Sequence, residues 1–291
     1  MSRSGGISGA VVVALLALVA CSRAPEAKQY ELKGQVLGVK PEAQEVLIKH
    51  EDIQGFMPGM TMPFRVREAK LLSHLQPGDL VTATLVVEET QAHLSAVTKT
   101  GHAELEVPAA PETASSGFEL LEPGDTVPEQ LLIDQNGKPR PLSTLRGHRV
   151  ALTFIYTRCP MPTFCPLMDR HFQEVQRAIK KDPALSDVRL VSVSFDPQFD
   201  TPPVMKAHAE RLQADPLIWT FMTGEREEIT RFAARFGVSV ERAEQNPIDI
   251  THNLRTAIVD AEGRLVKVHT GNEWTPADVL ADLKATPAPT N

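Results

Sequence analysis

The stretch Thr157-Arg158-Cys159-Pro160-Met161-Pro162-Thr163-Phe164-Cys165-Pro166 places two cysteines in one short loop. It follows an apolar run, Val150–Tyr156, that predicts a buried strand, and it precedes a predicted helix, Leu167–Lys180. Pro166 suits the first turn of that helix, because the amide hydrogens there have no partner within the helix in any case. The amino terminus of a helix stabilises negative charge, so a cysteine placed there ionises readily. A pair of thiolates either exchanges with disulfides or binds a soft metal.

The composition is that of an ordinary globular protein. The chain has 291 residues, enough for one large domain or two modest ones. Of these, 42% are apolar and 23% are charged. The net charge of -7, together with the lack of a basic stripe in the sequence, argues against nucleic acid as a partner.

The amino terminus has the features of a secretory signal. Arg3 is positive, and Ala10–Ala20 is an apolar run too short to span a membrane. The run ends Leu18-Val19-Ala20-Cys21, which resembles a bacterial lipobox. We therefore expect residues 1–21 to be a lipoprotein signal with a lipidated Cys21, and residues 22–28 to be a tether. The alternatives are an ordinary signal peptide cleaved nearby or a weak anchor. In the lipoprotein interpretation the protein is anchored in the cell envelope and faces the periplasm or the cell exterior.

The cysteine count supports a working role for the central pair. If Cys21 carries lipid, Cys159 and Cys165 remain as the two other cysteines of the chain. In an oxidising compartment such a pair forms either a structural disulfide or a redox-active or metal site. A disulfide here would enclose only five residues and would contribute little loop-closure entropy. The working site is therefore favoured, although the pair could still cycle through a disulfide.

Residues 29–102 have the pattern of a small β domain. Five strand candidates are separated by turn signals such as Gln76-Pro77-Gly78-Asp79. The candidates are Tyr30–Val39, Glu45–Lys49, Met62–Val66, Leu80–Val87 and His93–Thr98. Five short strands in about 75 residues predict a barrel or a sandwich. Residues 103–117 are rich in Pro, Ala and Ser and are predicted to be a linker.

Residues 118–285 alternate between strand and helix patterns, which predicts an α/β domain with a mixed sheet and helices on its faces. The expected helices are Leu167–Lys180, Pro203–Ala214, Glu225–Phe236 and Pro276–Lys284, the last capped by Thr275. The expected strands are Leu131–Ile133 with a short return strand, Val150–Tyr156, Val188–Phe195, Leu217–Met222, and a hairpin of Leu254–Asp260 with Gly263–His269. Residues 286–291 are expected to be a flexible tail.

A cluster of methionines marks a first candidate metal site. Met57, Met60 and Met62 are three of the eight methionines and fall within six residues. Thioether sulfur is soft and prefers Cu(I) or Ag(I) to Zn(II). Met60 and Met62 alternate, so on a strand they face the same side, and His50 stands ten residues before Met60. The alternative is that the methionines fill a hydrophobic core, and spacing alone leaves both possibilities open.

Residues 30–100 resemble the periplasmic copper-binding modules of the CusF type, which are small five-stranded barrels with an OB-like fold. In that family the ligands are a histidine and the two methionines of a Met-Thr-Met motif, with a tryptophan packed against the metal. The resemblance implies that His50, Met60 and Met62 are copper ligands. Met57 stands where the tryptophan is expected, and it is either a third sulfur ligand or a lid.

A metal at the two cysteines needs a third ligand, and His252 is the candidate. It stands at the mouth of a predicted strand, and strand ends in α/β sheets are where binding sites gather. Taken alone, a histidine at this place is more often a surface or packing residue. Asp196 and Asp200 are expected to cap the following helix and to order the loop near the cysteines, rather than to act as an acid–base pair.

From Phe118 to about Lys284 the chain resembles the Sco/SenC family, thioredoxin-like copper chaperones of cytochrome c oxidase assembly. The motifs that carry the resemblance are Phe154–Pro160, Cys165-Pro166, Ser194–Pro197 with Asp200–Pro202, and His252 before Asp260–Gly263. The resemblance implies copper binding by Cys159, Cys165 and His252. The family has three residues between its cysteines, whereas this chain has five.

Together these features lead us to expect a copper chaperone rather than an enzyme. The amino-terminal domain is expected to bind Cu(I), and the carboxy-terminal domain to bind Cu(I) or Cu(II). By resemblance, the expected partner is a haem–copper oxidase subunit that carries a copper centre. Two alternatives stay open. One is a thiol–disulfide oxidoreductase that uses Cys159 and Cys165 to keep an acceptor's cysteines reduced, and the other is copper sequestration without delivery.

Overall fold

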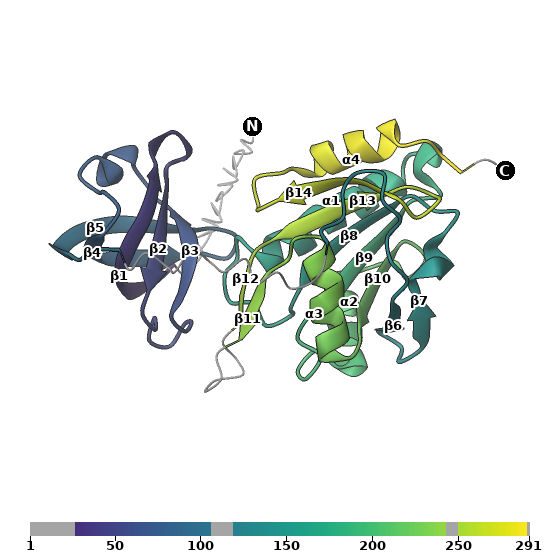
Figure 1. The fold of residues 1–291 in the computed structure, drawn as a ribbon, viewed down its shortest axis with the longest axis horizontal. Coiled ribbons are helices and arrows are strands. Elements are labelled where there is room, and N and C mark those ends of the chain that lie inside the picture. Colours follow the sequence, from purple (N-terminus) through teal and green to yellow (C-terminus); the bar gives the residue numbers. More distant parts are fainter. Residues whose placement is uncertain (1–26, 106–118, 243–249, 290–291) are drawn as a thin grey trace, which may run out of the picture.

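The computed structural model describes residues 27–105, 119–242 and 250–289, which form two domains side by side (Figure 1). The predicted signal peptide with Cys21, most of the tether and most of the linker lie outside the described residues. Within the described ranges, no helix is both long enough and apolar enough to cross a membrane.

The amino-terminal domain is an antiparallel β-barrel of five strands. The strands are β1 (Lys28–Lys40), β2 (Glu45–His50), β3 (Met60–Arg65), β4 (Asp79–Val87) and β5 (Ala92–His102). They are ordered β3-β2-β1-β4-β5, and a bridge between Val66 and Leu94 brings the two edges together. All five predicted strands are confirmed, and the closure selects a barrel over a sandwich. The interior is filled by alternate strand residues such as Leu32, Ile48 and Leu85, because a strand turns every second side chain inward.

The carboxy-terminal domain is built on a seven-stranded mixed sheet with helices on its faces, as predicted. The strand order is β14-β13-β8-β9-β10-β6-β7, in which β8, β9 and β10 are parallel. The strands are β6 (Leu131–Asp134), β7 (Pro139–Pro141), β8 (Val150–Ile155), β9 (Arg189–Ser194), β10 (Trp219–Thr223), β13 (Arg255–Val259) and β14 (Leu265–Thr270). The helices are α1 (Cys165–Ile179), α2 (Pro202–Arg211), α3 (Arg226–Arg235) and α4 (Pro276–Ala285). All six residues of β8 are buried, as expected for a central strand covered on both faces.

Two details show where the last helix begins and how far the packed part of this domain extends. Thr275 caps α4 through a reciprocal capping box with Asp278, which confirms the predicted helix start. Arg149 is buried, is paired with Asp187, and donates to the carbonyls of Leu283 and Thr286. The packed part of the chain therefore extends past the end of α4 into the segment expected to be a flexible tail.

A small two-stranded sheet was not predicted. It pairs β11 (Val240–Arg242) with β12 (Ile250–His252), and residues 243–249 between them lie outside the described ranges. Figure 1 shows this sheet between the main sheet and the barrel. Because β12 ends at His252, this sheet positions one of the predicted metal ligands.

Candidate metal sites

The barrel brings the predicted His/Met ligands together through strand register. His50 is the last residue of β2 and pairs directly with Met60 of β3, and Ile48 pairs with Met62. Directly paired residues of an antiparallel sheet point to the same face, as do residues two apart on one strand. His50, Met60 and Met62 therefore share one face of the β2–β3 pair.

The His50 ring is buried with one nitrogen left unpartnered. Its side chain is 3% exposed, and Nδ1 lies 2.7 Å from the carbonyl oxygen of Glu51. A carbonyl only accepts, so Nδ1 carries the hydrogen and Nε2 presents a lone pair. Among the described residues, Nε2 has no hydrogen-bond partner, and a buried polar atom in that condition costs about 1–3 kcal/mol. Burial also lowers the pKa of His50, which keeps the ring neutral. A soft metal cation fits this nitrogen.

The three methionines differ in exposure. Met57 and Met62 are buried in the apolar core of the barrel, and Met60 is half-buried. Met57 is brought back towards the strands by a tight turn in which it pairs with Ile53. At Gly59 an added Cβ would lie 2.9 Å from the His50 carbonyl oxygen, so only glycine allows this close approach. The structure therefore places Met57 in the barrel core beside the predicted ligands.

An aromatic neighbour of this site was missed in the sequence. Phe64 lies edge-on to His50, with ring centroids 5.4 Å apart. It stands two residues after Met62 on β3 and therefore shares its face. That alternation was the signal that could have found it. Residues 27–105 contain no tryptophan, and Phe64 is the aromatic side chain that packs against the His50 ring.

The carboxy-terminal site gathers at one end of the main sheet. Cys159 lies in the loop that follows β8, and Cys165 is the first residue of α1, with Pro166 in the first turn as predicted. The Cys165 Sγ atom lies 3.7 Å from Nε2 of His252. The His252 Nδ1 atom lies 2.9 Å from the carbonyl oxygen of Asn253, so Nδ1 donates this hydrogen bond and Nε2 faces the sulfur.

Two aromatic side chains fix the His252 ring. Tyr156 meets it edge-on at 5.4 Å and Phe195 lies against it at 4.6 Å between ring centroids. Tyr156 directly follows β8 and Phe195 directly follows β9. Parallel strands end at the same edge of a sheet, so their position after the strands was the signal for a role in the site.

Both cysteines are free thiols, and their environments drive their pKa values apart. Burial opposes ionisation of Cys159, but the neighbouring Cys165 thiol and His252 ring outweigh it, so the pKa of Cys159 is lowered. Burial, together with the adjacent Cys159 thiolate, raises the pKa of Cys165. Burial and the same thiolate raise the pKa of Tyr156, which stays a neutral phenol. Cys159 is therefore the more readily ionised thiol of the pair.

The three predicted ligands do not form a closed cage in this structure. Among the described residues, no group of three His, Cys, Asp or Glu side chains is arranged to hold a metal ion as it stands. The Cys159 Sγ atom lies 3.9 Å from the carbonyl oxygen of Met161. Binding of a metal by Cys159, Cys165 and His252 therefore requires these side chains to rearrange around the ion.

Asp196 and Asp200 order the cysteine loop, as expected. Asp200 is fully buried and accepts hydrogen bonds from the Thr157 amide at 2.9 Å, from the Thr157 hydroxyl and from Ser194. Asp196 accepts from Arg158 Nε at 2.7 Å. The expected helix capping is wrong, because Thr201 is the N-cap residue of α2. The carboxylates hold the turn that presents Cys159.

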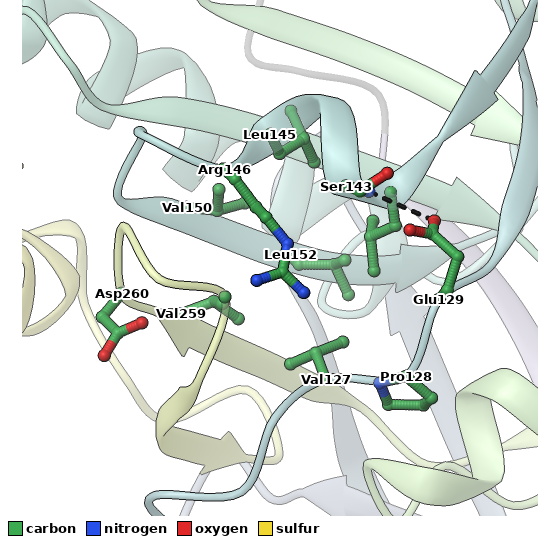
Figure 2. A pocket seen from close by; sticks show the side chains of 12 residues that line it. Val127, Pro128, Glu129, Ser143, Leu145, Arg146, Val150, Leu152, Val259 and Asp260 are labelled. Atoms are coloured by element: carbon green, nitrogen blue, oxygen red, sulfur yellow. Dashed lines mark hydrogen bonds between the residues drawn. The ribbon is translucent and has the colours of Figure 1, made fainter.

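A further hollow in this domain has no comparable chemistry (Figure 2). It is lined mainly by apolar residues such as Val127, Leu152 and Val259, and its volume of about 30 Å³ holds roughly one or two water molecules. The Glu129 carboxylate accepts from the Ser143 amide at 3.2 Å, and hydrogen bonds from Ser143 lower the pKa of Glu129. This hollow is too small for a substrate and contains neither cysteine nor histidine.

A thioredoxin-like domain with two free cysteines beside a histidine at the end of its sheet, joined to a barrel with a His/Met face, defines a class of soft-metal-binding proteins. The chain belongs to the SCO1/SenC family, whose model matches residues 119–287. A second family model, described as copper binding periplasmic protein CusF, matches residues 29–99. Copper is the metal that these comparisons support.

Individual relatives match the carboxy-terminal half. The chain is 30% identical over 154 residues to the SCO1 protein homolog of Bacillus subtilis, covering 52% of this chain and 78% of that protein. The crystal structure of a SCO1/SenC family lipoprotein from Bacillus anthracis aligns with a TM-score of 0.51 at 27% identity, covering 57% of this chain and 98% of that one. The structure of Bradyrhizobium japonicum ScoI with copper bound aligns with a TM-score of 0.47 at 28% identity, covering 57% of this chain and 100% of that one.

Proposed function

We propose that this protein is an extracytoplasmic copper chaperone that binds copper as cargo at two sites. The observation that carries the proposal is the 3.7 Å approach of the Cys165 sulfur to Nε2 of His252. Cys159 stands beside both, so two sulfurs and one nitrogen are available to one ion. Thiolate and imidazole ligands suit Cu(I), and cysteine must be reduced to bind it.

The barrel supplies a second site of different chemistry. His50, Met60 and Met62 share a face, and Nε2 of His50 is buried and unpartnered among the described residues. Thioethers are neutral, so Cu(I) would bind here without displacing a proton. We assign Met57 to this site as a third sulfur or a lid, because it lies in the same apolar core.

We further propose delivery to the copper centre of a haem–copper oxidase subunit, from a lipid anchor at Cys21. Membership of the SCO1/SenC family supports the acceptor, and the run that ends at Cys21 supports the anchor. A lipid anchor would keep the sites at the membrane surface, where an integral oxidase exposes its copper-binding domain.

The test is an anaerobic Cu(I) titration of the reduced mature chain against a chelator of known affinity. Wild type should bind two ions tightly, His252→Ala should weaken one of them, and His50→Ala should weaken the other. His74→Ala is the matched control, because His74 is an exposed histidine that is not among the proposed ligands. Copper binding that is unchanged in both site variants would refute the proposal.

A second candidate, thiol–disulfide exchange, is favoured by one observation: the pKa of Cys159 is lowered while that of Cys165 is raised. A low-pKa attacking sulfur beside a protonated resolving thiol suits reduction of an acceptor's disulfide. This candidate predicts turnover of a disulfide substrate without metal, abolished by Cys159→Ser and slowed but not abolished by His252→Ala, which removes one of the groups that lower the pKa of Cys159. Sequestration without delivery would instead show tight binding but no copper transfer to an isolated oxidase copper domain.

A further inference from the structure

The apolar core of the barrel contains a residue from the other domain. Met161, in the five-residue spacer between the two cysteines, is 2% exposed and is packed in the same cluster as Met57, Met62 and Phe64. The spacer is two residues longer than the family pattern. A loop of the thioredoxin-like domain therefore inserts the Met161 side chain into the barrel that carries the His/Met site.

The residues on either side of Met161 connect the two cores. Cys159 and Phe164 are partly buried and pack against the apolar clusters of both domains. Arg170 of α1 donates through Nη2 to the Pro162 carbonyl at 2.8 Å and to the Thr90 carbonyl of the barrel at 3.3 Å. The spacer is thus held against the barrel by both apolar packing and hydrogen bonds.

The two candidate sites open into one shared space. A cavity of about 320 Å³ is lined by Met62 from the barrel, by His252 from the carboxy-terminal domain, and by Phe164 from the spacer. Figure 1 shows that β3, which carries Met60 and Met62, lies on the side of the barrel that faces the other domain and β12. A ligand of each site therefore faces the same cavity.

We propose that the five-residue spacer between the cysteines docks the carboxy-terminal domain onto the barrel. Met161 anchors it in the barrel, closes the barrel copper site towards solvent, and leaves that site open towards His252 through the shared cavity. This inference rests on the proposed function, since it requires copper at the barrel. Copper then leaves the barrel for the cysteines of the same chain. It remains Cu(I) throughout: its bonds to His50 and the thioethers break, bonds to the cysteine sulfurs and His252 form, and any thiol that binds as thiolate releases its proton to solvent.

The test measures how fast Cu(I) is extracted from the barrel by excess bathocuproine disulfonate, a bulky chelator. The donor is the full chain with Cys159→Ser and Cys165→Ser, so that copper occupies the barrel alone. Met161→Asp places a charge in the apolar interface and should accelerate extraction by at least about tenfold, because the docked state then opens. Met161→Leu keeps the apolar volume and should extract at the rate of the parent donor.

Arg170→Ala provides a second variant that leaves the Met161 packing in place. It removes the two carbonyl hydrogen bonds of the interface and should accelerate extraction to a smaller extent. Equal rates in the parent, Met161→Asp, Met161→Leu and Arg170→Ala donors would overturn the docking inference while leaving copper binding intact. A parent donor that binds no Cu(I) would instead overturn the proposed barrel site, and the docking inference with it.

Discussion

His50 in the barrel and His252 in the thioredoxin-like domain are held in the same way, although they belong to different folds. Each ends a β-strand, and each donates from Nδ1 to the carbonyl of the next residue. Nε2 of His252 faces the Cys165 sulfur, and Nε2 of His50 is buried without a partner among the described residues. A neighbouring carbonyl accepts from Nδ1 in both cases, which leaves Nε2 as the nitrogen for the proposed metal.

The sulfur ligands are where the two sites differ. The barrel offers thioethers, which are neutral and have no proton to release at any pH. The other site offers thiols, of which Cys165 has a raised pKa and must release a proton to bind as thiolate. Only the cysteine site can also be closed by formation of a disulfide. We infer that pH and redox state act on the cysteine site and leave the barrel site largely unaffected.

The substitution Cys165→Ser should have the largest effect. Loss of a buried thiolate ligand should weaken Cu(I) binding at the carboxy-terminal site by more than about 100-fold, since even residues that only orient ligands cost 10–100-fold. A competition titration of the mature chain measures it. The barrel ion serves as the internal control, and parallel weakening of both ions would show that the two sites are not separate.

The substitution Met62→Leu tests whether the barrel methionines are ligands or core. A thioether ligand predicts Cu(I) binding at the barrel weaker by roughly 10–100-fold, while the free energy of unfolding changes by less than about 1.5 kcal/mol because the volume is kept. Met168→Leu in α1 is the matched control, as a fully buried methionine of the other domain. Unchanged binding in Met62→Leu would assign the methionines to packing alone.

Lowering the pH should separate the two sites further. Displacing one proton from Cys165 makes the affinity of the cysteine site fall by about tenfold for each pH unit below neutrality. The barrel affinity should stay level down to at least pH 6.5, because burial holds the pKa of His50 below that usual value. Chelator competition at several pH values measures both ions, and equal slopes would contradict the proposed difference in ligand chemistry.

The regular elements were predictable because their apolar periodicity is strong. The five barrel strands and the parallel strands β8 and β9 alternate or run continuously apolar over six residues or more, and each was confirmed. Strands β11 and β12 have three residues each, which is too short for any period to appear. His252 was therefore predicted as a ligand from its motif, while the small sheet that positions it was missed.

Contacts between distant segments were beyond the sequence. Phe64, Tyr156 and Phe195 flank the histidines, but their roles depend on which strand ends meet in space. Met161 is a stronger example, because its burial comes from a domain that ends some 60 residues earlier in the chain. A local sequence pattern carries no information about contacts between domains. The longer spacing between the cysteines could therefore be seen in the sequence, but the packing of Met161 against the barrel could not.

The smallest expected effect concerns the stability of the barrel and not its ligands. Asp79 is buried, and its bonds to Lys99 at 2.6 Å and to His102 at 2.9 Å lower its pKa to about 2. A lowered pKa contributes stability that is present above the usual value of 3.8 and is lost as the pH falls through 2. Asp79→Asn should therefore lower the melting temperature of the barrel by a few degrees at neutral pH, and the difference from wild type should shrink between pH 4 and pH 2.

Asp182→Asn in the other domain is the control, because its pair with Lys284 is more exposed and screened by solvent. A difference for Asp79→Asn that stays constant across that pH range would show that the ion pair contributes through packing and not through its charge.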